Sequence, residues 1–482
     1  MLNSLFTEYQ HADIPDYVEF RTEKSVLKHK KSVTLLRWPN GKPCSLINLW
    51  ILELASKTTG QSLRQYCSNI SHYIRYCYEN NISFTDTTDA TLFDIAKELT
   101  NARSSKKPDR YIRDRNRVRA ITSTIIDFLR WLETNICESN DQTLIGPHGT
   151  NSKITIKKMT NPANGRTYFH HPALPVDVSE QNDKRAMPDS FIEAIENEIS
   201  RLLLYSTTDK PLRQSRFAPQ GLFKAQQDYL YSRRLFMNWC MKNTGLRPEE
   251  LTSIPIPPLI VIYKTRDLQI PTLKRRVEPP PIRHFRINLS SCRKVSRYLS
   301  ARDEFIQCLG NCGIEPPHQN ALFLTQQGTP LSSASLAKDF SRLAVGAGLG
   351  NEKVCLSMYR HRFITTEILI HLRELLETDK PNREILSEAL IRTICERIRK
   401  KLGHGSPNSM WHYFDAAFDL LGVWGSIDSV LEHISDLDDI KDQLRCLNHV
   451  MLRDGASEEQ KSMVASLQEQ MSTIRAKRSP KL

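Results

Sequence analysis

The chain has 482 residues, of which 39% are hydrophobic and 25% charged, as in ordinary globular proteins, so two or three domains are expected. Its formal net charge of +13 favours a polyanionic partner, and nucleic acid fits better than a membrane because no apolar stretch is long enough to span a bilayer. The first residues do not resemble a signal peptide and the eleven cysteines are scattered, which predicts a cytoplasmic protein with reduced thiols.

Residues 1–45 are expected to form a basic N-terminal segment with a small hairpin. Residues 28–31 read Lys-His-Lys-Lys, and Asn40-Gly41 follows the apolar run 34–36. Asn-Gly is typical of the tight two-residue turns that join antiparallel strands. The sequence therefore predicts a hairpin whose turn lies at this dipeptide.

Residues 46–137 have the periodicity of a helical domain. Apolar residues recur at spacings of three and four over 63–77 and again over 118–132, which predicts two amphipathic helices. Arginine forks hold phosphate oxygens well, so we expect the basic cluster at the second helix to bind DNA, although a solvated helix start is the alternative. The cluster consists of Lys106, Lys107, Arg110, Arg113, Arg115 and Arg117.

The rest of the chain divides into three parts. Residues 138–186 lose the helical periodicity and collect Gly, Pro, Asn and Ser, which is typical of a linker. Residues 187–425 form a second domain with helices and short strands. Residues 426–482 form a helical tail with two apolar stripes, which either fold back on their own domain or dock on a neighbouring protomer. The expected fold class is mainly α with a small antiparallel β-sheet, an α+β protein.

Within 187–425, a glycine turn and three strand-like runs follow one another. Arg247 lies in the turn Thr-Gly-Leu-Arg-Pro, just before a short helix that begins with acids. The runs 259–263, 270–274 and 282–289 predict three strands of a small antiparallel sheet. Lys274 ends the second strand, before a connection that contains three consecutive prolines.

Two further clusters complete the candidate site. Ser357 and Arg360 begin an apolar helix, and His404 precedes Tyr413 by nine residues. Taken singly, each has an ordinary explanation, such as an ion pair, a helix cap or packing of an amphipathic tyrosine. The order of the four clusters along the chain is more informative than any one of them.

This order resembles the tyrosine recombinase (phage integrase) family, over about residues 46–420. Arg247 matches the arginine of that family's Thr-Gly-Leu-Arg turn, and Lys274 matches its hairpin lysine, with Lys264 as a competing candidate. Arg360 matches the arginine of a His-x-x-Arg box, and the Leu-Gly-His box and the nucleophile are matched by His404 and Tyr413. The resemblance implies a helical core-binding domain and a catalytic domain that together form a clamp around DNA.

The resemblance also implies a chemistry. Arg247 and Arg360 would hold the non-bridging oxygens of a phosphodiester, and their charges are expected to favour the phenolate of Tyr413. Tyr413 would attack phosphorus and form a 3′-phosphotyrosine ester, while Lys274 would protonate the leaving 5′ oxygen. His404 would hydrogen-bond a phosphate oxygen. No metal, nucleotide or other cofactor is expected, and Cys308, Cys312 and His318 supply only three possible zinc ligands.

The chain departs from the family pattern in two places. Ser357 stands where the family has histidine, and serine cannot act as a base near neutral pH. The segment between Arg360 and His404 is roughly twenty residues longer than usual, which predicts an added helical element rather than a bare loop. His361 is not expected to replace the missing histidine, because adjacent residues on a helix point about 100° apart.

The function that the resemblance implies is site-specific DNA recombination for integration or excision of a mobile element. The expected partners are double-stranded DNA and further recombinase subunits, in a homo- or hetero-oligomeric tetramer on paired sites, at the nucleoid of a prokaryotic cytosol. Two alternatives remain open. One is an enzyme like a type IB topoisomerase, and the other is a DNA-binding relative with impaired catalysis, for which Ser357 is the sequence hint.

Overall fold

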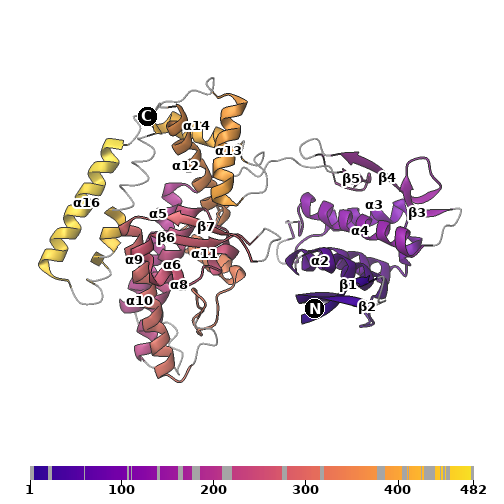
Figure 1. The fold of residues 1–482 in the computed structure, drawn as a ribbon, viewed down its shortest axis with the longest axis horizontal. Coiled ribbons are helices and arrows are strands. Elements are labelled where there is room, and N and C mark those ends of the chain that lie inside the picture. Colours follow the sequence, from indigo (N-terminus) through magenta and orange to yellow (C-terminus); the bar gives the residue numbers. More distant parts are fainter. Residues whose placement is uncertain are drawn as a thin grey trace. The chain divides into compact units, whose positions relative to one another are not determined.

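The computed structural model divides the chain into two compact units, Met1–Asn182 and Asp183–Leu482. Each unit has its own hydrophobic core, and Figure 1 labels the helices and strands of both units. The structure describes residues 5–19, 24–58, 60–105, 108–109, 111–137, 142–160, 165, 167–175, 185–208, 220–273, 279–314, 320–376, 386–403, 410, 412–424, 426–427, 440–445, 447–448, 451 and 456–478.

The first unit is built around four helices. Their buried faces carry the apolar residues that the periodicity predicted, and Phe128 lies at the centre, with its ring in contact with those of Trp50, Tyr73 and Phe84. The expectation of helices over 63–77 and 118–132 is confirmed. The helical elements are α1 (Ser45–Lys57), α2 (Gly60–Glu79), the 3-10 turn η1 (Phe84–Asp86), α3 (Asp89–Asn101) and α4 (Arg115–Asn135).

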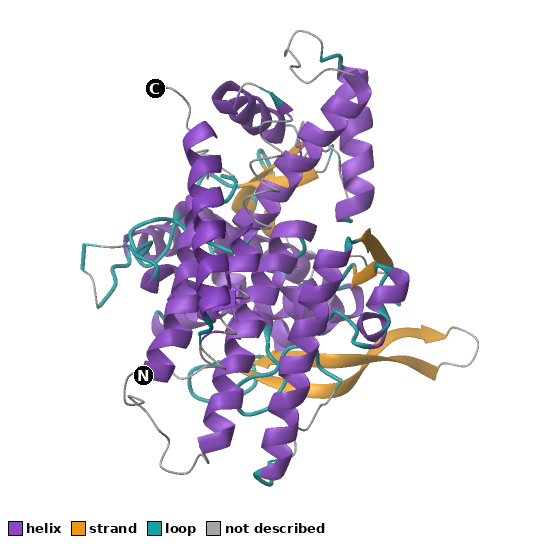
Figure 2. Ribbon diagram, turned by 90° about the vertical axis from the view of Figure 1, so that its left-hand side faces the viewer, coloured by secondary structure: helices purple, strands orange, loops and turns teal. Residues whose placement is uncertain are grey.

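The hairpin of the first unit lies earlier in the chain than expected. Strands β1 (Phe6–Glu19) and β2 (Lys24–Leu36) pair antiparallel and form the long twisted ribbon of Figure 2. The Asn40-Gly41 turn does close a short antiparallel bridge, between Arg37 and Pro43, but helix α1 starts immediately after it. The hairpin expected within residues 1–45 is therefore present, but its long strands precede Asn40-Gly41, which turns only this short bridge.

The segment 138–186, predicted to be a linker, contains a three-stranded sheet. Strands β3 (Thr143–Pro147), β4 (Ser152–Thr160) and β5 (Thr167–His170) are paired in that order, with β4 and β5 antiparallel. The sheet contacts α3 and α4, and buries Leu144 and Ile154 in the core of the first unit. The strands are short and separated by turn residues, so they lack the long periodicity by which a domain is recognised in sequence.

The second unit is a helical bundle with one two-stranded sheet. Helix α6 lies at its centre and packs against α5, α10 and α12, with Tyr229 stacked on Phe305 and Phe236 stacked on Tyr298 at ring distances of 4.6 Å. The longer helices are α5 (Asp189–Thr208), α6 (Gln220–Thr244), α10 (Leu289–Asn311), α11 (Ser333–Gly346), α12 (Ser357–Leu376), α13 (Glu388–Leu402), α14 (His412–Trp424) and α16 (Glu458–Arg478). The mainly α fold class with small sheets is confirmed.

The sheet of the second unit has two strands where three were expected. Strands β6 (Asp267–Pro271) and β7 (Ile282–Arg286) pair antiparallel, but residues 259–263 belong to the short helices α8 (Pro257–Ile260) and α9 (Ile262–Thr265). Leu259 and Ile262 are buried while Ile260 is 69% exposed. This three-residue spacing of buried side chains is that of a helix, and two prolines begin its first turn.

Part of the tail folds back on the second unit. Residues 440–445 are helical, Leu444 is buried, and Lys441 and Arg445 form ion pairs with Glu193 and Glu196 of α5. For this segment the structure favours the first of the two expectations for the tail.

Candidate functional site: an arginine cluster beside a buried tyrosine

A glycine turn places the first candidate residue. Gly245 has φ +56°, and a Cβ atom there would lie 2.7 Å from the ring of Phe363, so this tight turn requires glycine. The turn leads to Arg247, the N-cap of the short helix α7 (Pro248–Thr252), which has proline at its first position. Arg247 donates from its backbone N to Glu250 Oε2 and from Nη1 to Oε1, both at 2.9 Å.

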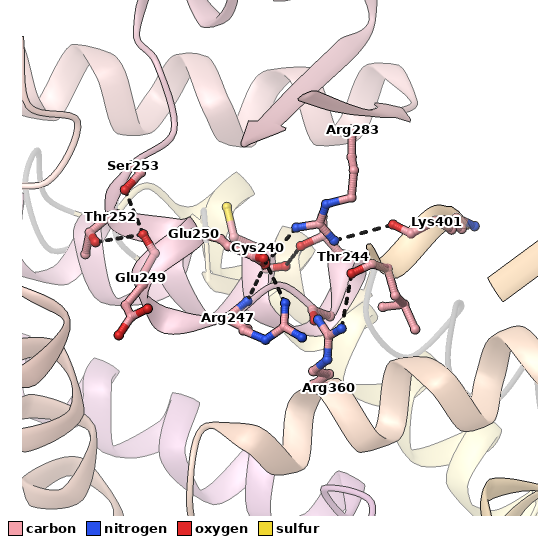
Figure 3. Close-up of polar contacts among 12 residues, drawn as sticks. Cys240, Thr244, Arg247, Glu249, Glu250, Thr252, Ser253, Arg283, Arg360 and Lys401 are labelled. Carbon is pink, nitrogen blue, oxygen red and sulfur yellow. Dashed lines mark hydrogen bonds and ion pairs between the residues drawn. The ribbon is translucent and has the colours of Figure 1, made fainter. Parts of the chain in front are cut away.

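Glu250 also binds a second arginine. Arg283 of β7 donates from Nη2 to Glu250 Oε2 at 2.7 Å and from Nη1 to the Lys401 carbonyl at 3.4 Å (Figure 3). Glu250 is fully buried and Arg283 is 7% exposed, and the Arg283 Nε has no hydrogen-bond partner. One carboxylate therefore holds two guanidinium groups in fixed orientations.

Arg360 of α12 brings a third guanidinium to the same place. Its Nη1 donates to the Gly245 carbonyl at 2.5 Å and its Nη2 to the Leu402 carbonyl at 3.2 Å, so it ties the turn before α7 to the end of α13. Burial, followed by repulsion from Arg247, lowers the pKa of Arg360 to about 9, while Glu250 acts in the opposite direction. Arg360 therefore remains charged at neutral pH.

The cluster carries more positive than negative charge. Among the described residues that act electrostatically on Arg360, Arg247 and Arg283 are cations and Glu250 is the acid that opposes them. Arginine does not lose its charge in proteins at ordinary pH, and uncompensated buried charge is costly. An anion in contact with the three guanidinium groups would relieve this repulsion.

Tyr413 lies beside this cluster, on the first turn of α14. Its side chain is 4% exposed, and its Oη is 2.5 Å from Nδ1 of His361, the residue that follows Arg360 on α12. Burial raises the pKa of Tyr413 to about 12, although the Arg360 guanidinium acts in the opposite direction. The effect of Arg360 is the one expected from the sequence, but burial outweighs it, so the expected phenolate is not favoured in this state.

Ser357 is placed differently from its neighbours on α12. It lies exposed at the start of the helix, and its Oγ is 3.0 Å from Sγ of Cys355. Lys274 and His404 lie outside the described residues, so their positions in the site stay predictions. The competing lysine, Lys264, is exposed on α9.

Sequence reasoning missed three residues of this arrangement. Glu250 follows Arg247 by three residues, the spacing of a capping box, and this was the available signal. Arg283 lay unnoticed in a strand-like run. His361 was set aside because of its direction on the helix, yet that direction brings it onto Tyr413.

The first unit has a basic cluster of its own. Arg75 of α2 and Arg113 and Arg117 near the start of α4 act together on His72, and Arg117 donates from Nη2 to Ser68 Oγ at 3.3 Å. Burial and repulsion from these arginines lower the pKa of His72 to about 4. Arg115 is exposed at the first position of α4, whereas Lys106, Lys107 and Arg110 lie outside the described residues.

The described residues contain neither a metal-binding group nor a membrane-spanning helix. They contain no group of three His, Cys, Asp or Glu side chains arranged to hold a metal ion, and His318 of the weak zinc candidate lies outside them. No helix in this part of the chain is both long and apolar enough to cross a membrane.

The fold and site together define a mainly α protein with a buried tyrosine beside a cluster of three arginines. No family model matches the sequence, and no curated protein matches it. Among solved structures the chain is similar to the XerH site-specific recombinase bound to palindromic difH substrate in a post-cleavage complex, with 15% identity over 78% of this chain and 83% of that chain, and a TM-score of 0.45.

Two other solved structures are also similar to the chain, with lower TM-scores. They are XerH bound to difH substrate in a pre-cleavage complex, with 14% identity, 78% and 82% coverage and a TM-score of 0.40, and the XerA recombinase, with 13% identity, 78% and 96% coverage and a TM-score of 0.29. These TM-scores are all below 0.5.

Proposed function

We propose that this chain is a tyrosine site-specific recombinase, which cleaves and rejoins double-stranded DNA through a covalent 3′-phosphotyrosine intermediate. The observation that carries the proposal is the excess of guanidinium groups over carboxylates beside a buried tyrosine, namely Arg247, Arg283 and Arg360 with Glu250 beside Tyr413. A phosphodiester is an anion that fits such a cluster, and tyrosine is a nucleophile that can attack it.

The arginines supply the electrostatic part of catalysis. As phosphorus becomes five-coordinate, negative charge grows on the non-bridging oxygens, and fixed guanidinium groups stabilise that charge without reorganising. Arg247 is held by Glu250, and Arg360 is held by two backbone carbonyls, so both are fixed before substrate binds. This use of arginine requires no metal ion.

The remaining roles are assigned from the family resemblance. Lys274 is the proposed acid that protonates the leaving 5′ oxygen, and His404 is the proposed donor to a phosphate oxygen. Because the tyrosyl ester keeps the energy of the broken bond, a second DNA end reverses the step and the strands are exchanged. Integration or excision of a mobile element, by a tetramer on paired sites, is the corresponding biological role.

The first unit is proposed to hold the duplex. The positive surface formed by Arg75, Arg113, Arg115 and Arg117 suits phosphate contacts, which position a protein on DNA without reading its sequence. Lys106, Lys107 and Arg110 extend the same basic stretch in the sequence. The two units together would then form a clamp around DNA.

Capture of a covalent adduct tests the proposal. Duplexes of random sequence with a central nick are incubated with the protein in EDTA, and DNA that stays attached in SDS is recovered and sequenced. We expect one sequence to be enriched, because cleavage beside the nick releases a short strand and traps the ester. Arg360→Ala should lower the adduct yield by at least about 100-fold, as loss of a fixed charge donor does.

The same experiment separates the alternatives. Enrichment of bound DNA without any SDS-resistant adduct would indicate a binding protein without catalysis. Relaxation of supercoiled plasmid that lacks the enriched sequence would indicate an enzyme like a type IB topoisomerase. A requirement for divalent metal in the cleavage step would contradict the proposed chemistry.

A further inference from the structure

His361 and Tyr413 form the closest polar contact at the nucleophile among the described residues. Nδ1 of the imidazole lies 2.5 Å from Oη of the phenol, and the ring centroids are 5.5 Å apart at an angle of 31°. This distance is shorter than that of a normal hydrogen bond between a nitrogen and an oxygen atom. It is also within the reach required for direct proton transfer between a nucleophile and its base.

Tyr413 needs a proton acceptor in order to act as a nucleophile. Because burial raises its pKa to about 12, only about one molecule in 10⁵ carries the phenolate at pH 7. Among the described residues, the charged groups that act on Arg360 beside this pair are Arg247 and Glu250 at the start of α7 and Arg283 on β7. The arginines are already protonated, and Glu250 is bound by Arg247 and Arg283, so none of these groups is placed to accept the proton.

The residue in the family's histidine place does not fill this role either. Ser357 lies exposed at the start of α12, where its Oγ faces Cys355. A serine hydroxyl is also far too weak a base near neutral pH. The imidazole one residue beyond Arg360 has both the position and the basicity that Ser357 lacks.

We infer that His361 is the general base that takes the proton from Tyr413 during DNA cleavage, an inference that rests on the proposed recombinase function. In the forward step the proton of Oη passes to Nδ1, and Oη forms a bond to phosphorus. The bond from phosphorus to the 5′ oxygen breaks, and that oxygen takes a proton from the general acid, proposed to be Lys274. Joining reverses each transfer, so the imidazolium returns its proton to the departing tyrosine.

Single-turnover cleavage of a nicked substrate tests the base, once adduct capture has supplied the sequence. We expect His361→Ala to slow adduct formation by about 10²- to 10³-fold, as removal of a general base does. Added imidazole should restore part of the rate of His361→Ala and none of the rate of Tyr413→Phe. His371→Ala is the matched control, because His371 lies on the same helix and faces Glu374 and Glu367 instead.

The pH profile is a second readout that a merely structural role would not change. The wild-type rate should rise with pH as the imidazole of His361 loses its proton, and then level off. In His361→Ala this limb should disappear, and the rate should instead follow hydroxide towards the pKa of Tyr413. Ser357→Ala should keep the wild-type profile and lose only a small factor in rate, since one neutral hydrogen bond is worth about 1 kcal/mol.

The joining half-reaction distinguishes loss of the base from loss of folding. A strand ending in a 3′-(4-nitrophenyl) phosphate carries a leaving group that departs without a proton, so joining to it needs no contribution from His361. Tyr413→Phe with and without His361→Ala should therefore join this strand at equal rates. If His361→Ala slows this joining in the Tyr413→Phe background as much as it alone slows cleavage, without rescue by imidazole, the assignment of His361 is overturned.

Two other outcomes are separable. The first is that the wild-type protein forms the adduct and His361→Ala forms it at a rate within about threefold of the wild-type rate. This result would overturn the inference and leave the recombinase function standing. Absence of any adduct from the wild-type protein, on every enriched sequence, would overturn the proposed function and this inference with it.

Discussion

Glu250 determines the geometry of the arginine cluster at the scale of single residues. It has no exposed surface, and its two oxygens bind Arg247 and Arg283 at 2.9 and 2.7 Å. Its carboxylate also accepts the backbone N–H of Arg247, which begins α7. A single acid thus orients two guanidinium groups while leaving the cluster positive.

Replacing this acid by its amide should be costly. In Glu250→Gln one acceptor oxygen becomes a donor that faces a guanidinium group, and breaking a buried ion pair costs about 3–5 kcal/mol. We expect a loss of that size in the free energy of unfolding, measured with urea, together with a large loss of cleavage. Glu249→Gln, the same change one residue away, should cost much less. Equal losses would mean that Glu250 is not the organising group.

The candidate residues differ in how far the sequence could predict them. Arg247, Arg360 and Tyr413 were identifiable because their order along the chain is informative even where each alone is not. His361 was not identifiable, because the angle of about 100° between adjacent helical residues was taken to place every catalytic side chain on the same face of α12 as Arg360. In the structure the Arg360 side chain bonds the Gly245 carbonyl, whereas the His361 side chain contacts Tyr413 of α14. The two neighbouring side chains therefore point in different directions and reach different partners.

At the scale of elements, two glycines allow the site to close. Gly245 turns the chain against Phe363, and Gly403, at φ +66°, ends α13 where a Cβ atom would lie 2.6 Å from Thr272. Arg360 donates hydrogen bonds to the carbonyl of Gly245 and to that of Leu402, the residue before Gly403. Their small size therefore lets α7, α12 and α13 meet at the cluster.

Gly245→Ala should destabilise the protein more than an ordinary glycine substitution. The left-handed backbone alone costs about 1–2 kcal/mol, and the clash with Phe363 adds to it. Gly348→Ala is the matched control, since Gly348 also has positive φ, at +80°, but nothing lies near its Cβ position. The difference between the two unfolding free energies measures the close packing. If the two variants are equally stable, the turn tolerates a side chain and this explanation fails.

The elements that the sequence mispredicted share a cause. Residues 259–263 look like a strand by composition, but two prolines begin a helix and burial follows a three-residue spacing. The sheet within 138–186 is built from short strands separated by turns, so no single window of sequence has enough periodicity to reveal it. In both cases tertiary packing decides what local propensity leaves open.

Two parts of the tail can be tested separately, namely residues 440–445 and helix α16. Residues 440–445 pair with α5 of the same unit, so truncation before them would remove intramolecular ion pairs as well as α16. On α16, Met463 is 56% exposed, while Leu467 is buried. Deletion of residues 457–482 should leave DNA binding by one subunit nearly unchanged. It should weaken the complex on paired sites, measured by gel mobility, and equal assembly of both forms would contradict docking on a neighbouring subunit.

At the scale of the whole molecule, positive charge gathers in each of the two units. The first unit presents arginines around His72, and the second surrounds Tyr413 with arginines. The two units have separate hydrophobic cores. The proposed function therefore assigns affinity for the DNA backbone to the first unit and the chemistry to the second.

Salt dependence tests this division. Each lost phosphate contact lowers the slope of log affinity against log salt by about 0.9. Replacing Arg75, Arg113 and Arg117 by alanine in the full chain should reduce that slope by up to about 2.7. The matched control removes the same amount of charge by replacing three lysines that form exposed or partly exposed ion pairs, namely Lys57, Lys153 and Lys461. This control should change the slope far less. Equal slopes in both triple variants would place the phosphate contacts elsewhere.

The central claim, that Tyr413 becomes covalently joined to DNA, is tested most directly by mass spectrometry of the adduct. Trypsin cleavage after Lys401 and Lys441 releases residues 402–441, a peptide that contains a single tyrosine, Tyr413. After nuclease digestion this peptide should carry the mass of a nucleotide 3′-phosphate, formed in EDTA and absent from Tyr413→Phe, which should still bind DNA. Attachment on any other peptide, or an adduct that survives in Tyr413→Phe, would contradict the account.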